Sequence, residues 1–189
     1  MKKWLPFIVV AVVIGIFVVN GMSTYNSLVT RQEAAKTAWS QVENQYQRRF
    51  DLIPNLVETV KGFAKQEREV LTEVTRLRSQ WGEARAAGNI DQAQQAARGL
   101  DTALSRLLLV VERYPELKSN QNFLRLQDQL EGTENRISVE RRRYNLAVQD
   151  YNTQIRRFPT TLLAPMFGFT RMPLFEAEPD AAKAPGVKF

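Results

Sequence analysis

The stretch that decides the fold is residues 5–19, which read LPFIVVAVVIGIFVV and contain no charged side chain. A membrane-spanning helix needs about 17–25 mostly apolar residues, and this run reaches about 19 when it is counted from Trp4 to Met22. No Pro or Gly-rich linker separates it from the amphipathic sequence that follows. Residues 1–22 are therefore predicted to be a membrane anchor that continues as one helix into the next domain.

A cleaved signal peptide is the alternative interpretation of the same run. Lys2 and Lys3 precede the run, as they would in either case, and Val19 and Gly21 could occupy the two small-residue positions of a cleavage site. However, no A-x-A pattern is present, and helical character continues past that point. Both observations favour an uncleaved anchor.

The flanking charges predict the orientation of this anchor. Lys2 and Lys3 lie immediately before the apolar run, whereas Arg31 and Lys36 follow it at a greater distance. The side with the nearer positive charge is normally cytoplasmic. We therefore expect the N-terminus in the cytoplasm and the rest of the chain outside it, with the reverse orientation as the alternative.

The composition excludes several classes of enzyme. The 189 residues contain neither Cys nor His, which rules out zinc sites built on these ligands, Cys nucleophiles, Ser-His-Asp triads and His-dependent diiron sites. The formal net charge of +6 indicates a mildly basic surface, on which acidic residues alternate with basic ones. We expect no cofactor and no metal site, and the alternation of charges argues against a nucleic-acid partner.

Apolar residues after the anchor recur at steps of three and four, the spacing of amphipathic helices. Three such stripes cover residues 35–81, 90–111 and 123–158. Because the connections between the stripes are short, neighbouring helices should be antiparallel. The predicted fold is all-α: an N-terminal transmembrane helix continues into an elongated up-and-down bundle of three long helices at residues 23–159.

Pro54 lies inside the first stripe, where a Pro removes one hydrogen bond and costs about 3 kcal/mol. The apolar phase continues through Phe50, Ile53 and Leu56 without a shift, which favours a kink over a reversal of the chain. A reversal at Pro54 would make four long helices instead of three. Before the second stripe, Asn89 is expected to cap the helix.

Residues 160–189 form the third predicted region and have a different composition. Four Pro residues exclude a continuous helix, yet the segment is too apolar for a disordered linker. We expect an irregular arm that docks in extended form, either on its own bundle or on a neighbouring subunit. The candidate assembly residues of this arm are Phe167, Phe169, Phe175 and Phe189.

Several short motifs stand on these elements. Residues 48–57 read RRFDLIPNLV, residues 114–117 read YPEL, residues 131–137 read EGTENRI and residues 141–145 read RRRYN. Together they resemble the hallmark sequences of the LemA family, from about Tyr25 to the end of the chain. The resemblance implies a bacterial membrane protein with a single N-terminal span and a helical bundle, here placed in the plasma membrane. It supplies no catalytic activity.

The motif residues are predicted to have structural roles. Arg48, Arg49 and Asp51 should satisfy the backbone groups that Pro54 frees and pair with Glu131 or Glu134, with a recognition site as the alternative. Tyr144 and Tyr151 should lie in the core with hydrogen-bonded hydroxyls. Motif asparagines that face inward should tie helices together, with a substrate pocket as the less favoured alternative. The full set is Arg48, Arg49, Asp51, Pro54, Asn55, Tyr114, Pro115, Glu131, Gly132, Glu134, Asn135, Arg136, Tyr144, Asn145, Tyr151 and Asn152.

The expected function is that of a non-enzymatic, membrane-anchored scaffold or assembly protein of the bacterial cell envelope. Its expected partners are the lipid bilayer, further copies of itself and another membrane protein, for which a membrane protease is one candidate. One alternative is a basic helical module that binds an anionic lipid surface. The other is a carboxylate-based hydrolase that uses Asp51, Glu131 and Glu134, although no part of the sequence shapes a cleft for its substrate.

Overall fold

The computed structural model describes residues 5–63 and 67–175, apart from the side chains of Leu5, Pro6, Val9, Val10 and Val13. All regular elements in these ranges are helical, which confirms the predicted all-α class. The chain forms two compact units. The first unit consists of residues 1–39 and 143–174, and the second of residues 40–142 and 175–189.

Helix α1 (Leu5–Phe63) is one helix of 59 residues, roughly 88 Å long at about 1.5 Å per residue. Pro54 lies inside it and does not reverse the chain, as predicted. The Pro54 side chain is exposed, whereas Ile53 and Leu56 are buried. Because Pro54 is on the solvent side, water can satisfy the carbonyl group that loses its helical partner.

The prediction of a single helix from residue 35 to residue 81 is wrong. Helix α1 ends at Phe63, and a separate helix α2 (Arg68–Ala86) follows it. The Phe63 side chain is exposed, so the apolar stripe has already left the core at this point. The next positions of the stripe, three and four residues after Phe63, are the polar residues Gln66 and Glu67, so the apolar stripe does not continue there. The described part of the chain therefore has four long helices: α1, α2, α3 and α5.

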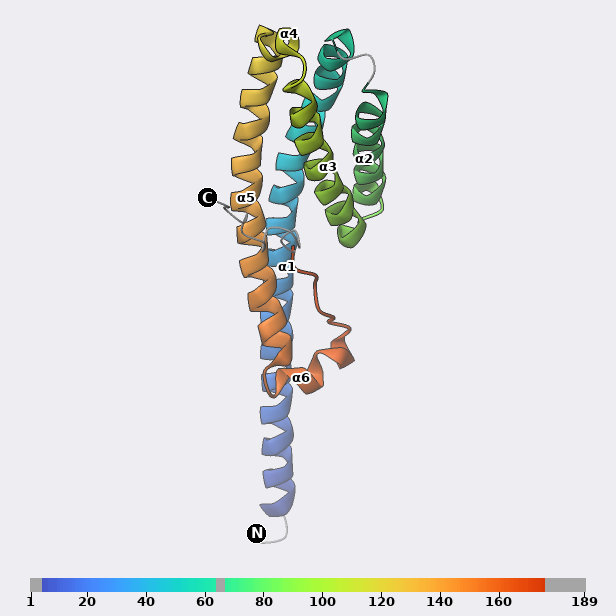
Figure 1. The fold of residues 1–189 in the computed structure, drawn as a ribbon. Coiled ribbons are helices and arrows are strands. Elements are labelled where there is room, and N and C mark those ends of the chain that lie inside the picture. The colour runs from blue at the N-terminus through green and yellow to red at the C-terminus, as the bar shows by residue number, and fades with distance from the viewer. Residues whose placement is uncertain (1–4, 64–66, 176–189) are drawn as a thin grey trace, which may run out of the picture. The chain divides into compact units, whose positions relative to one another are not determined.

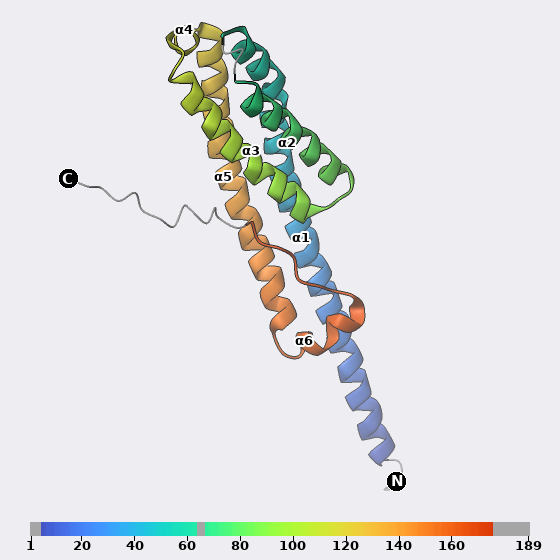
Figure 2. The same ribbon diagram turned by 45° about the vertical axis from the view of Figure 1, so that its right-hand side comes forward.

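In the second unit the chain runs up α1, down α2, up α3 and down α5 (Figures 1 and 2). Helix α3 (Ile90–Val111) packs against α2, and Gly99 stands at their closest approach. A Cβ atom added to Gly99 would lie 2.7 Å from Leu77 Cδ2. The up-and-down arrangement predicted from short connections is thus present within this unit.

Local signals place the ends of the helices correctly. Gly88 turns the chain after α2 with φ +65°. This conformation is unfavourable for any residue that has a Cβ atom. Asn89 then caps α3 as predicted, since its Oδ1 accepts a hydrogen bond from the Gln92 amide at 3.1 Å. After the one-turn helix α4 (Pro115–Lys118), Asn120 caps the long helix α5 (Gln121–Arg156) in the same way.

The first unit is built on an antiparallel pair, the start of α1 and the end of α5. Arg31 forms an ion pair with Asp150, and the rings of Trp39 and Tyr144 lie 5.3 Å apart. The chain then turns through α6 (Thr160–Leu163) and the 3₁₀ helix η1 (Pro165–Phe167), and continues as an extended arm to residue 175. The core of this unit contains Leu28, Tyr151, Ala164 and Phe169.

No helix formed by the described residues has both the length and the apolar character needed to cross a membrane. The structure therefore does not support the transmembrane part of the predicted fold. Five residues of the predicted span, Leu5, Pro6, Val9, Val10 and Val13, have side chains outside the described set.

Candidate functional site

A cluster of charges around the buried Arg49 joins three helices of the second unit. Arg49 on α1 donates through Nη1 to Asp101 Oδ1 on α3 and to Glu134 Oε2 on α5, both at 2.6 Å. The Arg49 side chain is only 8% exposed. Removing a guanidinium from water is costly unless its charge is paired. Asp101 and Glu134 supply that pairing for Arg49. The cluster therefore specifies the register of the three helices within this unit.

Asp101 is shared with a second guanidinium. Arg141 on α5 donates to Asp101 Oδ2 and to the Tyr46 hydroxyl. The Arg141 guanidinium also lies 5.3 Å from the Tyr46 ring centroid and 4.4 Å from that of Phe175. Both contacts are at cation–π distance. Arg141 thus connects the last described residue of the arm to the charge cluster.

In the first unit, motif residues of α5 bind the arm through its backbone. The Asn152 side chain donates to the Met172 carbonyl at 2.8 Å and accepts from the Met172 amide at 3.0 Å. The Tyr151 hydroxyl donates to the Thr170 carbonyl at 2.9 Å. Burial raises the pKa of Tyr151 above its ordinary value. The side chains of Tyr151 and Asn152 thus form hydrogen bonds with the backbone of the extended arm, as the backbone of an adjacent β-strand would.

A further backbone hydrogen bond and two phenylalanine side chains also hold the arm. The Tyr144 hydroxyl donates to the Pro173 carbonyl at 2.7 Å, and Phe169 is buried against Leu28. Phe175 is buried in the second unit, where its ring stacks on that of Tyr46. The described part of the arm therefore lies on its own chain, and Phe189 lies outside the described residues.

The remaining motif residues are not brought together. Tyr114 and Pro115 begin the short helix α4, and Asn145 is half-buried. The other motif side chains are exposed; these are Arg48, Asp51, Asn55, Glu131, Gly132, Asn135 and Arg136. The expectation that Arg48 and Asp51 would join the Arg49 network is wrong. Positions adjacent or two apart on a helix do not share a face, so only Arg49 points into the bundle.

The carboxylates proposed for a hydrolase do not meet. Asp51 accepts a hydrogen bond from Gln47, and Glu131 accepts one from Gln127, both on the surface. Glu134 is occupied by Arg49 in the charge cluster. The three side chains therefore have separate local partners and do not form a catalytic pair.

Asp101 is the residue of the charge cluster that sequence reasoning missed. It belongs to a stretch, residues 82–101, without a recognisable motif. A signal was nevertheless present, because Asp101 lies four residues after Ala97 and three before Leu104, both in the apolar stripe of α3. A carboxylate at an inward helical position requires a cationic partner.

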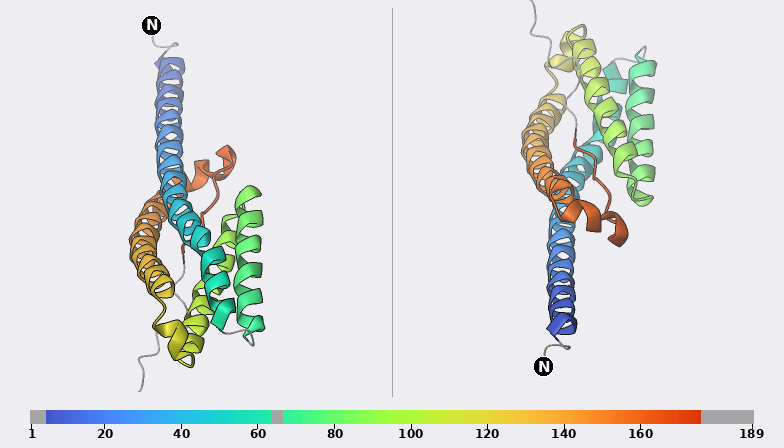
Figure 3. Two further views of the ribbon diagram at one scale, coloured as in Figure 1. Left: turned by 90° about the horizontal axis from the view of Figure 1, so that it is seen from above. Right: turned by 90° about the horizontal axis from the view of Figure 1, so that it is seen from below.

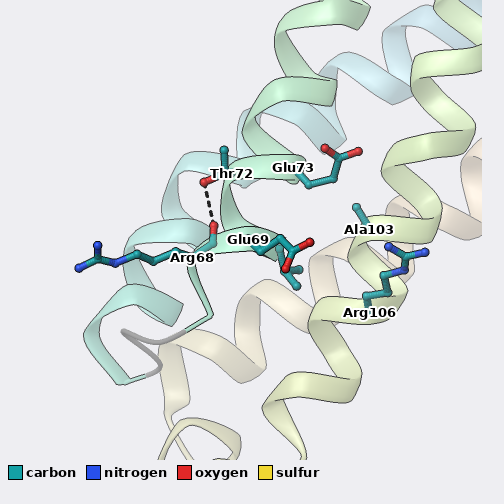
Figure 4. Close-up of a pocket in the computed structure, with 7 residues that line it drawn as sticks. Arg68, Glu69, Thr72, Glu73, Ala103 and Arg106 are labelled. Carbon is teal, nitrogen blue, oxygen red and sulfur yellow. Dashed lines mark hydrogen bonds between the residues drawn. The ribbon is translucent and has the colours of Figure 1, made fainter.

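Two surface hollows flank α2 in the second unit. One of about 560 Å³ lies between α2 and α3, where Figure 4 shows Glu69 and Glu73 on the side facing Ala103 and Arg106. A hydrogen bond from Arg76 holds the pKa of Glu73 below its usual value. The other hollow, about 670 Å³, lies between α1 and α2 and has apolar, hydroxyl and basic lining residues. Neither lining contains a nucleophile activated by a neighbouring base.

Comparison with known proteins agrees with the motifs. The family model described as LemA family matches residues 38–189. Magnetosome protein MamQ 2 of Paramagnetospirillum magneticum is 29% identical over 186 residues, which cover 86% of this chain and 68% of the relative. Magnetosome protein MamQ of Magnetospirillum gryphiswaldense is 28% identical with the same coverage.

A more distant relative carries the family's own name. Protein LemA of Metamycoplasma hominis is 23% identical over 181 residues, which cover 94% of this chain and 80% of the relative. The family model includes residues 48–57, 114–117 and 131–137, which hold the motifs, and it spans far more than half of the chain. This all-helical chain belongs to the LemA family.

Proposed function

We propose that this protein is a non-enzymatic scaffold, anchored in a bacterial plasma membrane by its N-terminal helix, that associates with itself and supports a membrane complex. The observation that carries the proposal is the continuity of α1 from Leu5 to Phe63. One unbroken helix connects an uncharged apolar run to the helices of the charge cluster.

The described side chains of the apolar run support the anchor. Large apolar residues there are between 54% and 71% exposed, which is unfavourable in water. The residues concerned are Phe7, Ile8, Val12, Ile14, Ile16, Phe17, Val18 and Val19. Lys2 and Lys3 before the run favour a cytoplasmic N-terminus, with the rest of the chain outside.

A non-enzymatic role is supported by the use made of the polar motif residues. The described charges of the cluster pair with one another, and Tyr151 and Asn152 bind backbone atoms of the arm. The names of the relatives refer to the magnetosome or to the family, and none of these names states a catalytic activity. The motif side chains that are buried or hydrogen-bonded across helices thus serve the fold.

A scaffold also needs surface for a partner. The second unit leaves Leu108 and Leu109 of α3 and Leu124 of α5 exposed. Exposed apolar side chains of this size can be buried against a partner. They support association with another copy of the chain or with a second membrane protein, for which a membrane protease is one candidate.

The anchor is tested by alkaline carbonate extraction of membranes that contain the full chain. The wild-type protein should stay in the membrane pellet. A Val12→Arg variant should move to the soluble fraction, because a charge near the middle of a span costs about 2.5–3.5 kcal/mol. Leu146→Arg, at an exposed leucine outside the run, is the matched control and should stay in the pellet. Complete release of the wild-type chain would overturn the anchor.

The scaffold role is tested separately by chemical cross-linking in native membranes, followed by purification and mass spectrometry. Cross-linked copies of the chain, together with one recurrent membrane protein, are expected. A strict monomer without a co-purifying membrane protein would overturn the scaffold role and leave the anchor unaffected.

A further inference from the structure

The segment that follows α5 exposes an unusual amount of apolar surface. Its inner residues, Thr160 and Ala164, are buried against the first unit. Its outer residues are not: Phe158 is 80% exposed, Leu162 63% and Met166 79%. We call these three outer side chains the apolar foot. An amphipathic turn in which the inner face is already packed has its outer face available for a second surface.

The apolar foot is attached beside the end of the apolar run of α1. The Phe167 ring, next to Met166, meets the Tyr25 ring edge-on at a centroid distance of 5.3 Å. Tyr25 follows Val19, the last residue of the run, by six residues, or about 9 Å along the helix. Figures 1, 2 and 3 agree that α6 lies beside α1 near the point where the N-terminal turns of α1 extend beyond the end of α5.

The length of the run places this point near a membrane surface. The run from residue 5 to residue 19 is about 22 Å long, or about 27 Å when it is continued to Met22. The hydrocarbon core of a bilayer is about 30 Å thick. An anchor this short brings Tyr25 to the headgroup region, where aromatic side chains are favoured. Phe167, which contacts Tyr25, brings the neighbouring Met166 of the foot close to this level.

The charges around the foot fit an anionic membrane surface. Residues 156–171 include Arg156, Arg157 and Arg171 and no acidic residue. All three arginines are exposed. Basic side chains beside exposed apolar ones are the pattern of helices that lie in the interface of anionic bilayers.

We propose that the segment from Arg156 to Arg171 is a second membrane contact: Phe158, Leu162 and Met166 enter the interface of an anionic bilayer, and the flanking arginines bind lipid headgroups. This inference rests on the proposed anchor, because the anchor brings the foot to the bilayer. The contact holds the first unit against the membrane and limits rotation about the single helix.

Because the chain has no Cys, single nitroxide labels can be attached without removing any native residue. Three full-length variants suffice: Leu162→Cys in the foot, Ile16→Cys in the anchor and Leu146→Cys as control. Leu146 is 57% exposed, close to the 63% of Leu162, and lies on α5 ten residues before Arg156. Each variant is reconstituted in vesicles of phosphatidylcholine and phosphatidylglycerol.

Oxygen concentrates in the bilayer and a nickel chelate stays in water, so the ratio of their collision rates with a label reports its depth. Labels at residues 16 and 162 should collide more often with oxygen than with the nickel chelate, and the label at residue 146 should show the opposite preference. A nickel preference at 162 with an oxygen preference at 16 would overturn the foot but leave the anchor. A nickel preference at 16 would overturn both.

Two further outcomes would also overturn the foot. A label at 162 shielded from both reagents would show that another protein surface, such as a second copy of the chain, covers it. An oxygen preference at 146 would show that the label on α5 lies in lipid as well. Unchanged circular dichroism of each labelled variant confirms that the fold is intact.

The arginines are tested by a triple variant, Arg156→Gln, Arg157→Gln and Arg171→Gln, that carries the label at residue 162. In vesicles with phosphatidylglycerol its ratio should shift back toward nickel relative to the labelled chain with its native arginines. In vesicles of phosphatidylcholine alone the two proteins should give the same ratio. Equal ratios in both lipids would overturn headgroup binding by the arginines.

Discussion

Asp101 accepts a hydrogen bond from Arg49 at 2.6 Å across 52 positions of the sequence, and so links α3 to α1. The same carboxylate accepts a hydrogen bond from Arg141 of α5. One acidic side chain thus serves two guanidinium groups in a place where Arg49 is almost inaccessible to water. The second unit depends on this carboxylate more than on any ion pair at its surface, since exposed pairs contribute little.

Replacing Asp101 should therefore destabilise the second unit. Asp101→Asn keeps the shape but removes one of the two carboxylates that pair with the buried guanidinium of Arg49, and the loss of a partner by a buried charge costs up to about 3–5 kcal/mol. The midpoint of urea unfolding of the full chain in detergent, followed by circular dichroism, should fall. Asp51→Asn is the matched control at an exposed position and should change stability by at most about 0.5 kcal/mol. Equal midpoints for the two variants would contradict the prediction.

Asn152→Ala should release the arm from α5. It removes two hydrogen bonds to Met172, each worth about 0.5–1.5 kcal/mol net. The released backbone becomes a better protease substrate, so trypsin should cut after Arg171 faster than in the wild-type chain. Asn135→Ala, at an exposed position on the same helix, should leave the cleavage rate unchanged. The cleavage is measured by mass spectrometry of timed digests.

The attachment of the arm should weaken at alkaline pH. Burial raises the pKa of Tyr151 in the folded chain, whereas an unfolded tyrosine titrates near about pH 10. The unfolded state therefore loses its proton first as pH rises. The stability that comes from the neutral Tyr151 is complete below about pH 10 and is lost as pH rises through the folded pKa.

Tyr151→Phe tests this pH dependence. The variant loses the hydrogen bond to Thr170 at every pH but has no phenol to ionise at position 151. Urea midpoints of the wild-type chain should fall more steeply than those of the variant as pH rises above about 10. Parallel curves would show that Tyr151 does not cause the alkaline loss.

Gly99→Ala should respond differently from Gly82→Ala. At Gly99 the new Cβ would lie 2.7 Å from Leu77 Cδ2, so the Leu77 side chain must move and the cost of its movement offsets the gain in helix propensity. At Gly82 a Cβ meets nothing within 4 Å, so the better helix propensity of Ala should stabilise α2 by about 0.5–1 kcal/mol. The midpoint temperature of thermal unfolding should be higher for Gly82→Ala than for the wild type. The double variant Leu77→Ala, Gly99→Ala should lose less than the sum of its single variants.

Much of the fold could be predicted because its signals are local. Asn89 before an apolar stripe indicated the start of α3, and the stripe of residues 90–111 matches the extent of that helix. The reversal after Phe63 was missed because the apolar phase resumes at Val70, so that a short polar interruption looks like one more turn of helix.

The candidate site could be predicted only in part. The motifs singled out Arg49 and Glu134, which the structure brings together, but also Arg48 and Asp51, which it leaves exposed. Which residue of an Arg-Arg pair faces inward depends on how the helix is rotated against its neighbours. Asp101 lay in a segment without a motif, so only its position in the apolar stripe could have indicated it.

The sequence by itself determined that the chain is helical, where most helices end and that its polar motifs lie on α1 and α5, because spacing, caps and Pro residues act within a few positions. Tertiary structure alone decided that α1 ends at Phe63, that Asp101 joins the arginines and that Asn152 holds the arm. These outcomes depend on contacts between residues far apart in the chain, such as Arg49 and Glu134 at a separation of 85 positions. The energy of desolvating a charge selects such partners only when the helices pack.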